Sequence, residues 1–120
     1  MYISHIYARI YARIGIFGSV VRMKGFSMRE KQMEQRLVKA AKASGGICPK
    51  LVSPGMDGMP DRLVLMPGGK IGFVEVKAPG KKLRPLQELR LRQLRRLGFK
   101  AYVLDGAEQI ESILGGIEDE

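Results

Sequence analysis

Residues 59–77 read MPDRLVLMPGGKIGFVEVK and decide the fold of this chain. Two apolar runs flank residues 67–69 (PGG), a combination that is typical of a tight turn between antiparallel strands. Side chains alternate along a strand, so Glu75 and Lys77 are expected on one face. The hairpin would also bring Asp61, at the start of its first strand, near Glu75 at the end of the second. Two carboxylates and an amine at one end of a hairpin suit a hard divalent cation and a phosphodiester.

Hydrophobic periodicity and turn residues predict further elements on both sides of the hairpin. The strand that follows the long second helix should return by a crossover and pair parallel with the second hairpin strand. The expected class is α/β, with a mixed four-stranded sheet flanked by helices in the order αβββαβ(α). The expected elements are a helix over 28–44, strands over 47–52, 62–66 and 71–77, a helix over 85–97, a strand over 100–104 and a helix over 107–114.

Two packing expectations follow from the same pattern. Leucines are expected to line the buried face of the 85–97 helix, namely Leu86, Leu89, Leu94 and Leu97. The strand over 71–77 is expected to be central, because an exposed strand would leave Phe73 in water on the face of Glu75. A central strand would bury Glu75 and Lys77 at least in part, which is costly unless they bind something. The alternative is a solvated ion pair on an exposed strand face.

Several short motifs in this order resemble one nuclease family. The chain resembles the virus-type replication-repair nuclease (VRR-NUC) domain, a branch of the PD-(D/E)xK nucleases, over roughly residues 28–115. The family usually has a small aliphatic residue where this chain has Met59. The matching pieces are Glu34 on the opening helix, Gly45-Gly46, Lys50, Gly58-Met59-Pro60-Asp61, Glu75-Val76-Lys77 and Pro85-Leu86-Gln87.

This resemblance implies a restriction-endonuclease-like core and a metal-dependent site. Mg²⁺, or Mn²⁺ in its place, prefers oxygen ligands and keeps several waters, so Asp61, Glu75 and the Val76 carbonyl would form a partial shell. The resemblance adds Glu34 as a ligand, directly or through water. It also implies that Lys77 orients the attacking water or stabilises the phosphorane. Gln87 would border the site and touch the lysine or the scissile phosphate.

Each of these residues also has a plainer interpretation. Asp61 could simply end a loop before a strand, and Glu34 or Glu30, one turn earlier, could be solvated helix charges. Gln87 stands near the third position of its helix, where a glutamine can cap the helix start.

Charge supports a polyanionic partner. The chain has a net charge of +9, and its last sixteen residues hold six acids and no base. Such a basic body favours nucleic acid. Basic residues near the expected metal end should contact phosphates and give position rather than sequence information. These candidate DNA contacts are Lys50, Arg62, Lys81, Lys82 and Arg84, and arginines also stud the 85–97 helix.

The chain divides into residues 1–27, a single domain over 28–115 and an acidic tail over 116–120. Residues 1–27 contain no acid and no apolar stretch long enough for a membrane span. They are expected to be a disordered or loosely helical extension upstream of a start at Met28, and the alternative is a targeting peptide or a basic arm on DNA. The single Cys48 excludes an internal disulfide and any cysteine-cluster zinc site, which fits a cytoplasmic location.

The sequence therefore predicts a metal-dependent DNA endonuclease. The resemblance implies a role in viral or mobile-element replication and repair, and homodimers that act on branched DNA such as four-way junctions. The alternative is a basic nucleic-acid-binding module that keeps the fold without catalysis. Against that alternative stands the intact set of Glu34, Asp61, Glu75, Lys77 and Gln87.

Overall fold

The sheet is built on the hairpin that the sequence predicts. In a computed structural model, which describes residues 29–119, β1 (Arg62–Met66) pairs antiparallel with β2 (Lys70–Val76). β3 (Lys100–Leu104) pairs with the other edge of β2 in parallel, as expected for a strand returning after a crossover. The strand order is β1-β2-β3, so β2 is central and its end lies between two neighbours.

The expected fourth strand is wrong: the sheet has three strands, and the order of elements is αββαβα. The segment over 47–52 does run beside β1, where Ile47 and Leu65 exchange two backbone hydrogen bonds of 2.9 Å. However, it forms only two isolated bridges, Ile47 with Leu65 and Lys50 with Arg62. Pro49 lies between them and has no N–H to donate, so it can only accept a bond from Leu63. The ladder is therefore interrupted.

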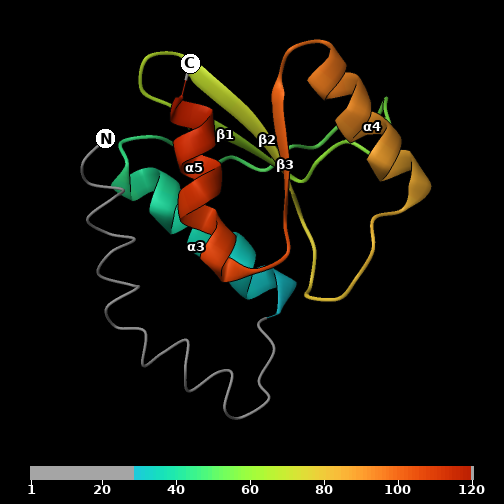
Figure 1. Ribbon diagram of the computed structural model, residues 1–120, viewed down its shortest axis with the longest axis horizontal. Helices are drawn as coiled ribbons and strands as arrows, with labels where there is room; N and C mark the ends of the chain where they lie inside the picture. The colour runs from blue at the N-terminus through green and yellow to red at the C-terminus, as the bar shows by residue number, and fades with distance from the viewer. Residues whose placement is uncertain (1–28, 120) are drawn as a thin grey trace.

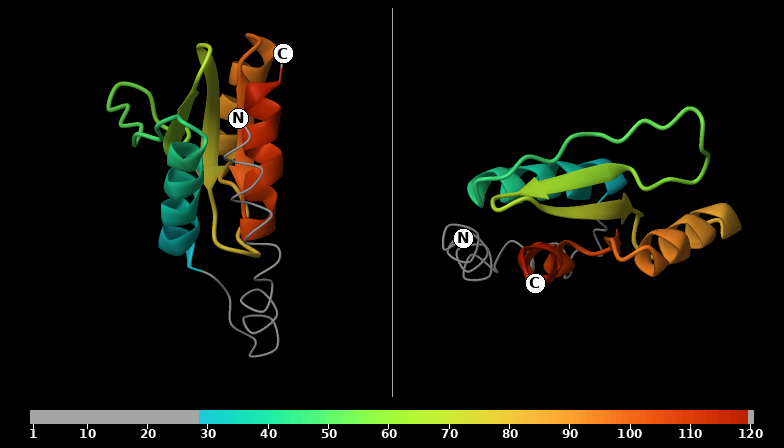
Figure 2. Two further views of the ribbon diagram at one scale, coloured as in Figure 1. Left: turned by 90° about the vertical axis from the view of Figure 1, so that its left-hand side faces the viewer. Right: turned by 90° about the horizontal axis from the view of Figure 1, so that it is seen from above.

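The helices cover both faces of the sheet. α3 (Glu30–Ala43) and α5 (Ile110–Glu118) pack on one face, and α4 (Pro85–Arg96) packs on the other (Figure 1). Figure 2 shows α3 and α4 lying apart, with strands between them. The larger core lies under α3 and α5, and the smaller one under α4. The buried members of the smaller core are Leu91, Leu94 and Ala101, and the side chains packed against them are Met59, Phe73, Leu83 and Val103.

α4 turns a different face to the sheet from the one expected. Its buried residues are Gln87, Leu91 and Leu94, which follow the i, i+4, i+7 spacing of one helical stripe. The predicted burial of Leu94 is confirmed, but Leu86, Leu89 and Leu97 are exposed. The glutamine therefore takes a place on the buried stripe that the sequence assigned to leucine, and this orientation brings its amide to the sheet.

The C-terminal helix is longer than expected. After the short η1 (Ala107–Gln109), α5 continues to Glu118, and Ile117 is buried in the larger core. Gly72 of β2 makes this packing possible, because a Cβ there would lie 2.5 Å from the Ile117 side chain. Between residues 29 and 119, no helix is long and apolar enough to cross a membrane. The expectations for residues 1–27 lie outside the described residues.

Candidate active site at the end of the hairpin

Hairpin register brings the two predicted acids to the same place. Gly68 and Gly69 form the turn with positive φ angles of 83° and 74°, a conformation that glycine adopts without a Cβ penalty. Arg62 pairs with Val74, so Asp61 lies one step beyond, beside Glu75. The Asp61 carboxylate accepts a 3.1 Å hydrogen bond from the Val76 N–H. Asp61 therefore lies against the end of β2 that holds Glu75.

Glu75 is buried, with an exposed fraction of only 2%. Its Oε2 accepts a 2.8 Å hydrogen bond from Gln87 Nε2 and lies 3.8 Å from Lys77 Nζ. Its Oε1 is buried and has no hydrogen-bond partner among the described residues. A buried carboxylate oxygen without a partner is costly, since ionised oxygens can accept several bonds. The unpartnered oxygen is therefore available to a cation.

The electrostatics of the two acids are linked. Burial and, after it, the negative charge of Asp61 raise the pKa of Glu75, and the positive charge of Lys77 partly opposes them. The resulting pKa is about 7. Burial also raises the pKa of Asp61, while the hydrogen bond from Val76 lowers it in part. Two neighbouring carboxylates that share one nearby lysine are undercompensated. A bound divalent cation would favour the ionised form of both.

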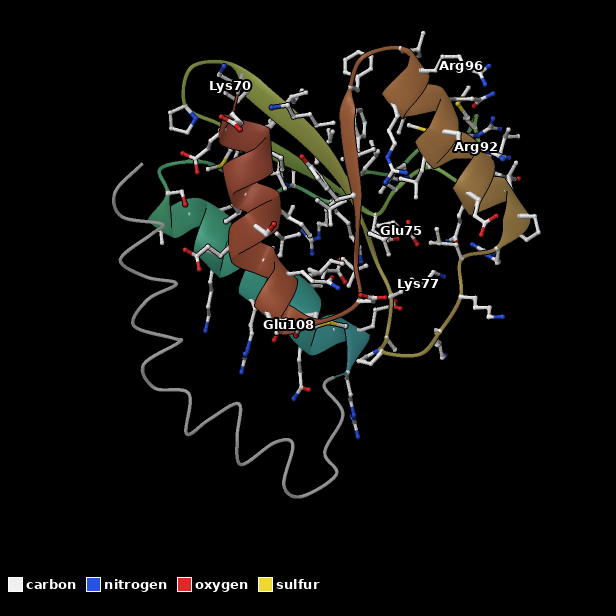
Figure 3. All side chains as sticks on the ribbon, in the orientation of Figure 1. Lys70, Glu75, Lys77, Arg92, Arg96 and Glu108 are labelled. Carbon is white, nitrogen blue, oxygen red and sulfur yellow. The ribbon has the colours of Figure 1, made fainter. Side chains whose placement is uncertain are left out.

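Lys77 lies where a strand residue two places after Glu75 should lie, on the same side of the backbone. Figure 3 shows the two side chains close together at the end of β2. The Lys77 side chain is 15% exposed, so its ammonium faces the acids while remaining near solvent. A mostly buried lysine beside two carboxylates can stabilise negative charge that develops on a bound phosphate.

Gln87 caps the start of α4 and contacts Glu75 through a single amide. Its Oε1 accepts a 2.9 Å bond from the Arg84 N–H, which caps the start of α4. Its Nε2 donates to Glu75, and the side chain is 5% exposed. The protein partner is thus a carboxylate rather than the lysine, and the expected contact with the scissile phosphate stays a prediction. This contact fixes one Glu75 oxygen and leaves the other unpartnered.

The two glutamates of α3 make separate contacts near the site, and the expected role of Glu34 as a metal ligand stays a prediction. Glu34 accepts a 2.8 Å bond from Arg62 Nε, and Arg62 also donates to the Cys48 carbonyl at 2.9 Å. Glu30 accepts a 3.2 Å bond from the Ala78 N–H, just after Lys77. The charge of Glu34 raises the pKa of Asp61, whereas that of Glu30 raises the pKa of both Asp61 and Glu75. Glu30 is therefore the α3 carboxylate that acts on the whole acidic pair.

The described residues offer a limited set of ligands. From residue 29 to residue 119, no three histidine, cysteine, aspartate or glutamate side chains are grouped so that they could hold a metal ion. The protein oxygens in reach are those of Asp61 and Glu75, with the Val76 carbonyl as the expected third. This set matches a hard cation that keeps several waters.

The candidate DNA contacts separate into two groups. Lys50, Lys81, Lys82 and Arg84 are exposed, and the last three belong to the loop that joins the site to α4. Arg62 is half-buried and its guanidinium is occupied by Glu34 and Cys48. Nothing in the spacing of Glu34 and Arg62 along the chain indicates this pairing, which depends on how α3 docks on β1.

Three comparisons with known proteins agree with this geometry. Residues 8–108 match the VRR-NUC domain family. The chain is 47% identical over 90 residues to "Putative nuclease p44" of Acyrthosiphon pisum secondary endosymbiont phage 1, covering 75% of this chain and 96% of that protein. A solved structure described as a VRR_NUC domain is 31% identical, with a TM-score of 0.67, and covers 72% of this chain and 94% of its own. The family match over residues 8–108 spans the three strands and α4.

Proposed function

The chain belongs to the VRR-NUC family, and from this premise we propose that it is a divalent-metal-dependent DNA endonuclease that hydrolyses phosphodiester bonds. One observation supports the proposal above the others. Asp61, Glu75 and Lys77 converge at the end of β2, with a buried Glu75 oxygen left unpartnered. A module that only binds nucleic acid has no need of a buried carboxylate that lacks a partner.

Asp61, Glu75 and the Val76 carbonyl are the groups that would hold Mg²⁺ or Mn²⁺. The unpartnered Glu75 Oε1, and a Glu75 pKa raised to about 7, fit a group whose charge is balanced only by a ligand. When bound, the cation supplies a water of lowered pKa and offsets charge on the phosphate.

The protein side chains have separate tasks in this proposal. Lys77 faces the acidic pair, so its ammonium orients the attacking water or stabilises charge on the phosphoryl oxygens. Gln87 holds Glu75 Oε2 through a 2.8 Å bond and thereby directs Oε1 toward the site. Glu30, whose charge acts on both acids, holds the backbone after Lys77 through Ala78. Glu34 supports the first strand through Arg62.

The substrate proposed is branched DNA, cleaved by a homodimer in phage or mobile-element replication and repair. The support is indirect: a curated relative is a phage protein named as a nuclease, and the loop beside the site is basic. Leu97 and Phe99, between α4 and β3, are 73% and 45% exposed, which supports contact with a second copy. A two-fold dimer would supply two sites for paired nicks.

The test uses labelled duplex, flap and four-way junction DNA with Mg²⁺, Mn²⁺ or a chelator. Wild-type protein should cleave at least one substrate only when metal is present, and Glu75→Gln should bind the same DNA without cleaving it. Glu88→Gln, which removes one exposed carboxylate of α4 instead of a buried one, serves as the matched control. Binding without cleavage of any substrate by the wild type would favour the non-catalytic module instead.

A further inference from the structure

The arginines of α4 fall into two groups by what they contact. Arg90 donates to the Asp57 carbonyl at 2.8 Å and to Gln93, and Arg95 donates to the Ala101 carbonyl at 2.9 Å. Arg92 and Arg96 are exposed, and neither forms a hydrogen bond or an ion pair within the described part of the chain. The first two arginines therefore hold α4 in place, whereas the second two have no structural task.

Arg92 and Arg96 are four residues apart, so they lie on the same helical face. That face points away from the sheet, because the buried stripe is formed by Gln87, Leu91 and Leu94. Like charges at this spacing repel each other in the absence of a ligand. An anion with two or more phosphates would remove this repulsion, and guanidinium groups bind phosphate oxygens in a bidentate manner.

The distance from the candidate active site to Arg92 and Arg96 follows from their positions along α4. Gln87, in the first turn of α4, contacts Glu75. At a rise of about 1.5 Å per residue, Arg92 and Arg96 lie about 7 and 13 Å further along the helix. Figure 3 shows Arg96 at the end of α4 remote from Glu75 and Lys77, and Arg92 nearer the middle of the helix. These lengths correspond to about two to four base pairs of duplex, at 3.4 Å per pair.

The charge between the two points is also favourable. The loop before α4 presents Lys81, Lys82 and Arg84, and within α4 the only acid is Glu88. Residues 81–96 thus carry seven basic side chains and one acid. Phosphate groups of a nucleic-acid backbone are the anions that basic residues of this kind contact.

We infer that Arg92 and Arg96 contact the phosphates of a duplex arm about two to four base pairs from the scissile bond. This inference rests on the proposed function. The pair positions the arm and reads no base sequence, because it makes only backbone contacts. It therefore acts on DNA affinity rather than on the chemistry at Glu75.

The experiment compares two double variants that each remove two exposed charges from a helix. Arg92→Ala/Arg96→Ala removes the α4 pair, and Lys39→Ala/Lys42→Ala removes two exposed lysines from α3, which packs on the opposite face of the sheet. Alanine favours helix, and circular dichroism should show both variants folded. Binding of labelled duplex is measured by fluorescence anisotropy in chelator over a series of KCl concentrations, so no cleavage is needed.

The α4 variant should reduce the slope of log affinity against log salt by about 1.8, since each lost phosphate contact changes it by about 0.9. The α3 variant should leave the slope within about 0.5 of the wild-type value, less than one contact's worth. If the two variants change the slope equally, the inference is wrong, and cleavage by the wild type would still support the proposed function. If only the α4 slope falls while the wild type never cleaves, the arm contact stands and the proposed function fails.

A second measurement locates the contact once the cleavage position is mapped. Neutral methylphosphonates are placed singly along the substrate, and binding is measured for the wild type and the α4 variant. The wild type should lose affinity at positions about two to four base pairs from the scissile bond, at 3.4 Å per pair, and the α4 variant should show no further loss there. Equal losses in both proteins at those positions would overturn the inference.

Discussion

Replacing Glu75 by glutamine should remove the loss of stability that the metal-free protein undergoes as pH rises, and should also remove its cleavage activity. The substitution keeps the size of the side chain, and an amide oxygen can still accept the bond from Gln87. What it removes is a negative charge that is almost fully buried and has one unpartnered oxygen. Relative to the wild type, the variant should therefore gain stability as pH rises, while its cleavage activity is lost.

The magnitude follows from the Glu75 pKa. Folding raises this pKa from its usual value of 4.5 to about 7, chiefly by burial and then by the charge of Asp61. The native state therefore retains a proton that the unfolded state has lost between these two values. The free energy of unfolding should fall as pH rises through this window. One pKa unit corresponds to about 1.4 kcal/mol, so the wild type should lose roughly 2 to 3 kcal/mol between pH 5 and pH 8.

The measurement is urea denaturation in chelator at several pH values for wild type and Glu75→Gln. The new amide N–H₂ has no assigned acceptor, which costs about 1 to 3 kcal/mol at every pH. The effect of the charge is therefore read from the pH dependence alone. The free energy of unfolding of the variant should rise relative to that of the wild type from pH 5 to pH 8. Glu88→Gln should show no such trend. A pH-independent difference in the free energy of unfolding would refute the argument that folding raises the pKa of Glu75.

Four further substitutions test the roles of the surrounding side chains. Lys77→Ala should retain Mn²⁺ binding in calorimetry but lose about 10²-fold or more in cleavage rate, and unchanged cleavage would exclude the assigned role. Gln87→Ala removes both the helix cap and the bond to Glu75, so it should lower the free energy of unfolding in urea by about 1 to 3 kcal/mol; a change under about 0.5 kcal/mol would contradict the contact. Glu30→Gln removes a negative neighbour and should lower the pKa of Glu75, moving the acid limb of the pH–rate profile to lower pH. Glu34→Gln should leave that limb closer to its wild-type position, and the opposite order would reassign the helical carboxylate.

Residues near one another in the sequence were predicted well because the relevant physics is local. The glycine turn at 68–69 fixes the hairpin register, and the register alone places Asp61 beside Glu75. The wrong prediction of a strand over residues 47–52 also has a local cause. The apolar pattern of this segment favours a strand, but Pro49 has no N–H to donate and interrupts the ladder. Metal binding and catalysis at these residues stay predictions.

The sequence by itself determined the hairpin, the central place of β2, the parallel return of β3 and the meeting of two acids with a lysine. These features depend on side-chain alternation, turn conformation and the handedness of crossovers, which act over short stretches of chain. Only the tertiary structure decided which α4 stripe meets the sheet and which α3 glutamate acts on both acids. Those choices depend on how separate helices dock, because rotating a helix by one residue exchanges its buried and exposed side chains. That docking brought Gln87 to Glu75, joined Glu34 to Arg62 and left Arg92 and Arg96 facing solvent.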